Sequence, residues 1–176
     1  MEQLAMKRRK GNLTVRELPE GFEYENYCGK EEQISDWLKI CRHGLINEES
    51  GKECFEEAIL KHEWIIPEKD LFFVKDRNKK RVATITGIAF KEPNVGYIHM
   101  VAADPSVSRM GIGPAMLYHA MKYLEERGVD GYFLTTDDFR LPAIKIYLDA
   151  GFEPDYNSPD NTPERWNKVF DSLKKR

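Results

Sequence analysis

A short loop with two glycines, Ser108–Ala115, constrains this chain more than any other feature. It follows an apolar, strand-like run, Val95–Ala103, and it leads into a run with helical spacing, Ile112–Arg127. Glycine adopts backbone angles that other residues avoid, and the first turn of a helix leaves N–H groups unpaired. Such N–H groups, at the positive end of the helix dipole, bind phosphate. The loop therefore predicts a phosphate-bearing ligand at the end of a strand.

The rest of the pattern predicts further strands and helices. Apolar runs between turn residues predict strands, and apolar residues at helical spacing predict helices. The other expected strands are Leu13–Leu18, Leu71–Lys75, Arg81–Phe90 and Gly131–Thr136. The other expected helices are Glu31–Arg42, Lys52–His62, a segment from a cap at Asp137-Asp138 to Ala150, and Glu164–Lys174. This order indicates an α/β or α+β fold, with helices on both faces of one sheet.

Length and charge limit the number of domains and the kinds of partner. A chain of 176 residues favours one domain, here residues 13–176, and the polar, basic segment 1–12 is expected to be a flexible tail. A net charge of -3 with mixed signs argues against a nucleic-acid binder. No apolar run is long enough to span a membrane. Three cysteines without zinc-finger spacing favour a reduced, cytoplasmic setting and no bound metal.

Two motifs in this order resemble those of the GNAT N-acetyltransferases. The segment Ser108–Ala115 is similar to that family's acetyl-CoA loop, Gln/Arg-x-x-Gly-x-Gly/Ala. Gly111 and Gly113 match its two small positions, whereas Ser108 stands where Gln or Arg is usual. The segment Pro142–Phe152 is similar to the family's second signature, Ala-Ile-x-Leu-Tyr-x-x-x-Gly-Phe.

The resemblance, which spans roughly residues 81–152, implies a fold and a co-substrate. In this family a mixed, mostly antiparallel sheet carries two parallel strands that splay apart, and acetyl-CoA lies between them without a metal. Those strands are here Val95–Ala103 and Gly131–Thr136. Arg140 stands where the family often has Asn. The residues that the resemblance places around acetyl-CoA are Val101, Ala102, Ala103, Ser108, Arg109, Met110, Gly111, Ile112, Gly113, Pro114, Ala115 and Arg140.

Two side chains are candidates for the proton transfers of acetyl transfer to an amine. The resemblance makes Tyr147 the acid for the departing thiolate, and a phenol with a pKa of about 10 is protonated at neutral pH. His99 is the candidate acceptor of the amine proton, because strand alternation places Tyr97, His99, Val101 and Ala103 on one face. The structural alternatives are a core aromatic and a satisfied buried histidine. A Glu or Asp from the N-terminal helices is an alternative base.

We consider three candidate functions for a chain with these motifs. The first is an acetyl-CoA-dependent N-acetyltransferase that acts on a small-molecule or peptide amine. The second is a non-catalytic acyl-CoA sensor, because the strand Val95–Ala103 has no carboxylate and because Ser108 and Arg140 depart from the family pattern. The third, a nicotinamide oxidoreductase, is disfavoured because Met116 stands where a dinucleotide loop needs its third glycine. The acceptor and the oligomeric state, including a homodimer, are left open.

Overall fold

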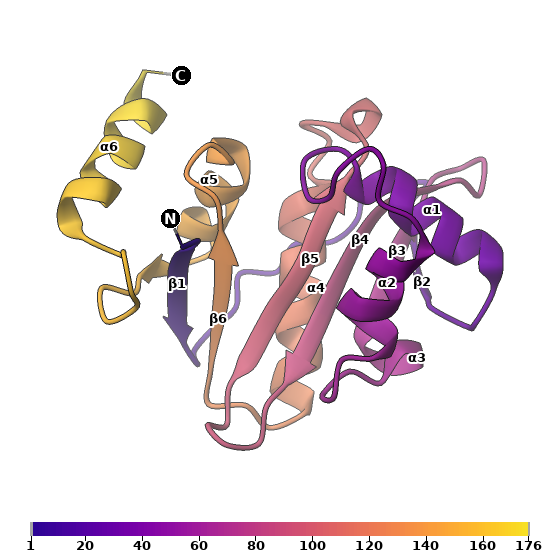
Figure 1. Ribbon diagram of the computed structural model, residues 1–176, viewed down its shortest axis with the longest axis horizontal. Coiled ribbons are helices and arrows are strands. Elements are labelled where there is room, and N and C mark those ends of the chain that lie inside the picture. Colours follow the sequence, from indigo (N-terminus) through magenta and orange to yellow (C-terminus); the bar gives the residue numbers. More distant parts are fainter. Residues whose placement is uncertain (1, 176) are drawn as a thin grey trace.

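One seven-stranded sheet runs through the molecule (Figure 1). The computed structural model describes residues 2–175. The strands are β1 (Leu4–Arg9), β2 (Glu23–Asn26), β3 (Leu71–Lys75), β4 (Arg81–Ala89), β5 (Gly96–Ala103), β6 (Gly131–Thr136) and β7 (Glu153–Pro154). The helices are α1 (Glu31–Cys41), α2 (Lys52–Phe55), η1 (Glu56–Leu60), α3 (Pro67–Asp70), η2 (Pro105–Val107), α4 (Ile112–Glu126), α5 (Leu141–Asp149) and α6 (Pro163–Lys174). The strand order is β2-β3-β4-β5-β6-β1-β7, in which only β5 and β6 are parallel neighbours.

Helices cover both faces of this sheet, as the sequence predicts. Helix α4 packs on one face of β4 and β5. Helices α5 and α6 join the same core, where Ile144 and Trp166 are fully buried. Helix α1 and the α2–η1 segment cover the opposite face, where Trp37 and Phe55 are fully buried and their rings lie edge to face, 5.1 Å apart. The prediction of a mixed sheet between two helical layers is therefore confirmed.

Strand β4 lies at the centre because its side chains suit two buried faces. Every residue from Val82 to Ile88 is buried, and such runs are typical of strands covered on both sides. The hydroxyl of Thr84 donates to the carbonyl of Phe72 at 3.1 Å, so it is satisfied inside the core. In the neighbouring strand, a Cβ at Gly96 would lie 2.7 Å from Cδ1 of Leu124. Glycine there lets α4 lie close against the sheet.

The flexible tail expected over residues 1–12 is wrong, because residues 4–9 form β1. This strand pairs antiparallel with β6 on one side and with β7 on the other. Leu4 and Met6 are fully buried. The charges that indicated a tail have partners instead: Lys7 pairs with Asp155 at 2.8 Å, and Arg8 donates to the carbonyl of Ala150 at 2.8 Å. Long-range pairing thus outweighs the local polarity of the segment.

Three other local predictions also need correction. The segment Leu13–Leu18 is irregular rather than a strand, although its two leucines pack against the core. The helix expected over Lys52–His62 is α2 followed by a π-helical turn, η1. The expected cap at Asp137-Asp138 is absent, since α5 begins at Leu141 and the carboxylate of Asp138 accepts from Nε of Arg165 at 2.9 Å. That carboxylate therefore ties the β6–α5 connection to α6.

Candidate functional site

The glycine loop forms the turn between β5 and α4. The short helix η2 leads into a turn over residues 108–111, in which Gly111 is left-handed with φ of 84°. A Cβ on Gly111 would meet no atom within 4 Å, so its backbone angle, and not crowding, favours glycine. Arg109 is also left-handed, with φ of 62°. Two positive φ angles therefore shape the turn.

Several N–H groups of this turn have no protein acceptor. Within residues 2–175, the N–H groups of Arg109 and Gly111 make no backbone hydrogen bond. Those of Ile112 and Gly113 belong to the first turn of α4 and make no hydrogen bond to a carbonyl of residues 2–111. Pro114, the next residue, has no N–H to leave unpaired. These four donors, at the positive end of a helix of 15 residues, form an arrangement that suits a phosphate group.

The second glycine, Gly113, allows α4 to approach α5. A Cβ on Gly113 would lie 2.8 Å from Cδ1 of Ile146. A side chain at this position would therefore push the two helices apart. Because α5 also carries Tyr147, Gly113 helps to set the distance between the turn and the candidate acid.

A carboxylate fixes the start of the turn. Asp104 accepts the N–H of Ser106 at 2.9 Å and the ammonium of Lys80 at 3.3 Å. Hydrogen bonds from Ser106, followed by that from Lys80, lower the pKa of Asp104 to about 2. The carboxylate is therefore ionised at neutral pH and holds η2 in place after β5.

Strands β5 and β6 are paired only over their first halves. The register joins Gly96–Ile98 to Tyr132–Leu134, and no later pair forms between these two described strands. In Figure 1 the two strands diverge toward their carboxyl ends, Ala103 and Thr136. The backbone of residues 101–103 therefore has no strand partner on the side of β6. The splayed parallel strands that the resemblance implies are present.

A β-bulge in β5 changes which side chains share a face. Met100 has φ of 51°, and the pairing with β4 shifts register at this point. Before the bulge, Tyr97 packs with the cluster under α1; after it, Val101 and Ala103 pack with the cluster under α4. The prediction that Tyr97, His99, Val101 and Ala103 share one face is therefore wrong, because one extra residue inverts the alternation.

His99 lies against the π-helical turn. Its Nε2 is 3.3 Å from the carbonyl oxygen of Ala58, and its ring is 5.9 Å from the ring of His62. A carbonyl only accepts, so Nε2 carries the proton and Nδ1 is the nitrogen left to accept one. Burial lowers the pKa of His99 to about 4. The ring is neutral at pH 7 and is a weaker base than an exposed histidine.

Tyr147 is buried on α5. Its side chain is packed near Phe152, with the ring centroids 6.2 Å apart, and only 4% of the residue is exposed. Burial raises the pKa of Tyr147 to about 12, although the positive charge of Arg140 lowers it. The phenol is therefore fully protonated at neutral pH.

Arg140 connects α5 to the unpaired part of β5. It is the N-cap residue of α5, and its Nη2 donates to the carbonyl of Val101 at 3.1 Å. Within residues 2–175 this is the one hydrogen bond of the guanidinium. Arg140 thus reaches the same backbone that the resemblance places against the acetyl-CoA arm.

An aromatic group that the sequence analysis did not assemble lies beside His99. The rings of Tyr97 and Phe133 stack 4.5 Å apart, and Phe90 stacks 6.0 Å from Phe133. Trp64 meets Phe90 edge to face at 5.7 Å and is 38% exposed. These rings come together because the strand register sets Tyr97 opposite Phe133. The sequence alone does not give this register. These rings offer an apolar wall next to the parted strands.

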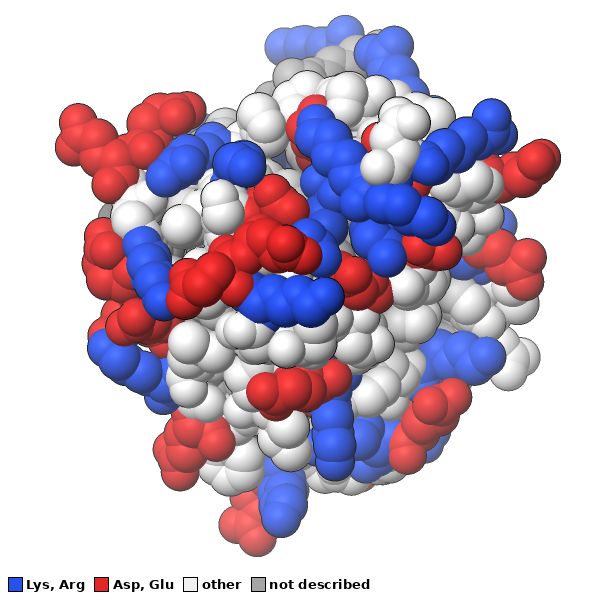
Figure 2. All heavy atoms as spheres, turned by 90° about the vertical axis from the view of Figure 1, so that its right-hand side faces the viewer, with Lys and Arg blue, Asp and Glu red and all other residues white. Residues whose placement is uncertain are grey.

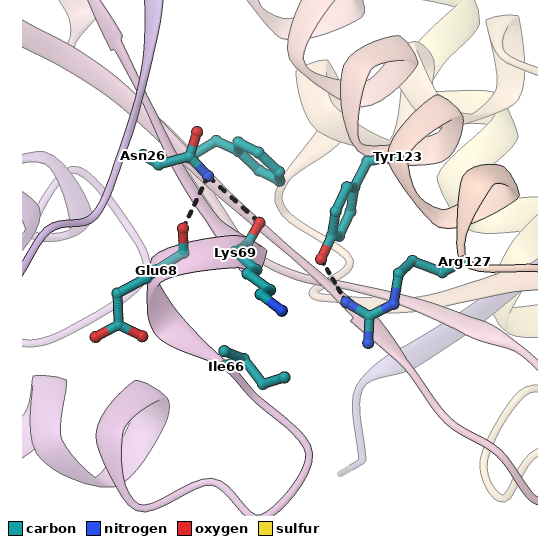
Figure 3. Close-up of a pocket in the computed structure, with 7 residues that line it drawn as sticks. Asn26, Ile66, Glu68, Lys69, Tyr123 and Arg127 are labelled. Atoms are coloured by element: carbon teal, nitrogen blue, oxygen red, sulfur yellow. Dashed lines mark hydrogen bonds between the residues drawn. The ribbon is translucent and has the colours of Figure 1, made fainter.

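A cavity of about 580 Å³ lies at the other end of α4 (Figure 3). Its lining residues are Asn26, Ile66, Glu68, Lys69, Phe72, Tyr123 and Arg127. The buried carboxylate of Asp70 accepts from the N–H of Ile66 at 2.6 Å, from the Tyr123 hydroxyl and from Arg127 at 3.3 Å. The amide of Asn26 donates to the carbonyls of Glu68 and Lys69. These groups satisfy one another and tie α3 to α4, so we assign this cavity no role in the site.

The face formed by α1, β2 and β3 carries acidic and basic side chains side by side (Figure 2). Arg81 binds Asp36 at 3.0 Å and also pairs with Glu25, while Lys75 lies 3.1 Å from Glu23. These pairs join α1, β2, β3 and β4. The mixture of charges on this face differs from the continuous basic surface of a nucleic-acid binder.

The described chain has few groups that suit metal binding or cysteine chemistry. Within residues 2–175, no three His, Cys, Asp or Glu side chains gather as metal ligands. Cys41 is fully buried, and burial raises the pKa of its thiol. No described helix combines the length and the apolar character that crossing a bilayer requires.

Comparison with known proteins identifies relatives of this chain. The sequence model of the acetyltransferase (GNAT) family matches residues 31–152. Two mycothiol acetyltransferases, from Thermobifida fusca and Thermobispora bispora, are 27% and 24% identical over 71% and 80% of this chain. The match covers 41% and 49% of those two proteins, so this chain spans less than half of their length.

Solved structures share the fold at low identity. A GCN5-related N-acetyltransferase from Sphaerobacter thermophilus is similar with a TM-score of 0.68 and 17% identity, over 88% of this chain and 50% of that one. The ribosomal-protein-S18-alanine N-acetyltransferase of Escherichia coli gives a TM-score of 0.60 and 21% identity, over 75% and 77% of the two chains. At these identities the likeness establishes the architecture alone.

Proposed function

The chain belongs to the GNAT acetyltransferase family, and on this premise we propose that it transfers an acetyl group from acetyl-CoA directly to a primary amine. The observation that carries the proposal is the parting of β5 and β6 beside a turn with four unpaired N–H groups. Acetyl-CoA is a long thioester that carries a diphosphate. The gap between the strands suits its extended arm, and the unpaired N–H groups suit the charge of the diphosphate. The acceptor is an amine on a small molecule or on a peptide.

The turn and the unpaired strand divide the binding of the donor between them. The N–H groups of Arg109, Gly111, Ile112 and Gly113 donate hydrogen bonds to the diphosphate oxygens. Ser108, Pro114 and Ala115 shape the turn around them. The backbone of residues 101–103 offers the carbonyls and N–H groups that β6 does not pair. The arm of the donor takes the place of a strand there, because unpaired backbone groups favour an extended partner.

In the chemical step the amine nitrogen bonds to the acetyl carbon, and the carbon–sulfur bond breaks. The electron pair of that bond stays on the sulfur. Tyr147, whose pKa is raised to about 12, donates a hydrogen bond to this sulfur but keeps its proton. Complete transfer to a thiolate, whose conjugate thiol has a pKa of about 8.5, would be uphill by about 5 kcal/mol. The thiolate therefore leaves hydrogen-bonded and is protonated later by solvent.

In this proposal, His99 relays the proton of the attacking amine to water. Nδ1 is its accepting nitrogen, because Nε2 donates to the carbonyl of Ala58. A pKa of about 4 makes His99 unable to store that proton at neutral pH, so a water molecule beside Nδ1 carries it away. The aromatic rings of Tyr97, Phe133 and Phe90 then form the apolar side of the acceptor site.

A non-catalytic acyl-CoA-binding protein on the same fold is the second candidate. The low pKa of His99 favours it, because no strong base then lies on β5. Binding of the donor without turnover is the behaviour that separates this candidate from the first.

The decisive experiment follows thiol release with acetyl-CoA and a panel of amines. The panel includes peptides with free N-termini, because one structural relative is named for an alanine of ribosomal protein S18, and small amines, because curated relatives are named mycothiol acetyltransferases. Calorimetry with CoA on the same protein reports binding separately. Binding without thiol release for any amine favours the second candidate, and no binding at all contradicts both.

A matched pair of variants tests the role of Tyr147. We expect Tyr147→Phe to lower kcat by about a hundredfold while the affinity for acetyl-CoA stays the same. Tyr156→Phe is the control, because Tyr156 is 52% exposed and lies outside the site. Turnover that is equal in both variants removes Tyr147 from the mechanism.

A further inference from the structure

Arg140 is a partly buried cation with little to bind in the protein. Its guanidinium has five N–H donors, and within residues 2–175 it makes one hydrogen bond, to the carbonyl of Val101. It forms no ion pair with any carboxylate of the described chain. A cation that is held partly out of water without a counter-ion is stabilised by an anion that a ligand brings to it.

No carboxylate of residues 2–175 lies within ion-pair distance of the Arg140 guanidinium. Arg140 and Tyr147 are seven residues apart, at the start and on the body of α5, which brings them to one face after two turns. Titratable groups near this pair include Cys41 on α1 and Tyr97 on β5. The carboxylates of Asp137 and Asp138, shortly before Arg140 in the chain, accept hydrogen bonds from Gln3 and Arg165. Burial raises the pKa of Cys41 and of Tyr147, so both are neutral at pH 7. The positive charge of Arg140 thus lies beside the unpaired part of β5 without a carboxylate bound to it.

We propose that Arg140 supplies the positive charge that stabilises the CoA thiolate as it leaves. This proposal rests on the proposed function. It states that Arg140 interacts with the sulfur of CoA, rather than only contributing to the binding of acetyl-CoA. When the amine nitrogen bonds to the acetyl carbon, the sulfur takes the electron pair of the broken bond. Arg140 keeps its proton and holds the resulting negative charge, while the hydroxyl of Tyr147 donates a hydrogen bond to it. The Val101 carbonyl fixes the guanidinium in place, and its second lone pair is free for the donor arm.

The test measures the pKa of the thiol of CoA bound to the protein, by the ultraviolet absorbance of the thiolate across a pH series. A unit charge about 6 Å away lowers a thiol pKa by about one to two units from its free value of about 8.5. We expect that shift in the wild type, its loss in Arg140→Met, and a partial shift in Arg140→Lys, which keeps the charge on a shorter reach. Lys145→Met is the control, because the exposed Lys145 pairs with Asp149 at 3.0 Å on the same helix.

Desulfo-CoA, which lacks the sulfur, separates this proposal from a general role in binding. We expect calorimetry to give equal affinities for desulfo-CoA in the wild type and in Arg140→Met, and a weaker affinity for CoA in the variant above the pKa of the bound thiol. Equal losses for both ligands, or an unshifted thiol pKa in the wild type, overturn the proposal while leaving the transferase function intact. If the wild type binds neither ligand, the proposed function itself fails.

Discussion

Acidification is expected to destabilise the fold through His99. Burial lowers the pKa of this imidazole from 6.5 to about 4 in the folded protein. Between these two values the unfolded chain binds a proton that the folded chain does not. The free energy of unfolding therefore falls as the pH drops below about 6.5, and this contribution stops growing below about pH 4. His119, whose pKa burial also lowers, acts in the same direction.

The size of the effect follows from the shift in pKa. Relative to pH 8, linkage predicts a loss of about 1.4 kcal/mol at pH 5.5 and of about 3 kcal/mol near pH 4. Carboxylates with lowered pKa values, such as Asp104 at about 2, act mainly below pH 4. The interval between pH 4 and pH 6.5 therefore isolates the histidines.

Urea titrations at several pH values measure this loss in the wild type and in His99→Gln. Glutamine keeps a donor for the Ala58 carbonyl but has no proton to gain, so the variant should lose much less stability on acidification. His43→Gln is the control, because His43 is exposed. The reasoning is refuted if the variant and the wild type lose the same free energy of unfolding between pH 8 and pH 4.5.

Two further predictions concern the turn and the start of the sheet. Gly111→Ala should lower the free energy of unfolding by about 1 kcal/mol from its left-handed angle alone, because no neighbour lies within 4 Å; a loss above about 3 kcal/mol in urea titration would contradict this. Asn161 is 2% exposed, and its amide bonds both backbone groups of Ala5 and the carbonyl of Asp155. Asn161→Ala should therefore cost about 2–4 kcal/mol, and a thermal midpoint equal to that of the wild type would argue against it.

Sequence reasoning succeeded where the signal is local. The bounds of α4 agree closely with the prediction, because Gly111 and Gly128 stand just outside its two ends with φ of 84° and 83°. Strand β4 was recognisable because apolar and β-branched residues run through it without interruption. In both cases a few neighbouring residues carry the whole signal.

Sequence reasoning failed where distant residues decide. The strand β1 looks like a tail because the partners of Lys7 and Arg8 lie far along the chain. The prediction that His99 and Val101 share one face of β5 was wrong because the bulge at Met100 depends on pairing with β4. The aromatic stack of Tyr97 with its cross-strand neighbour depends on register in the same way. Pairing between strands that are distant in the sequence determines all three features, and a short stretch of sequence does not reveal that pairing.

The position of β1 also governs the order in which the molecule assembles. This strand is synthesised before β2, β3, β4 and β5, yet its partners β6 and β7 are made after all of them. Until those partners emerge, β1 has nothing to pair with, and β6 in turn exposes a bare edge until β1 returns to it. Such a long loop closure slows folding and leaves a window for aggregation. The parted strands are therefore supported on their far side only after β6 has been made and has paired with β1.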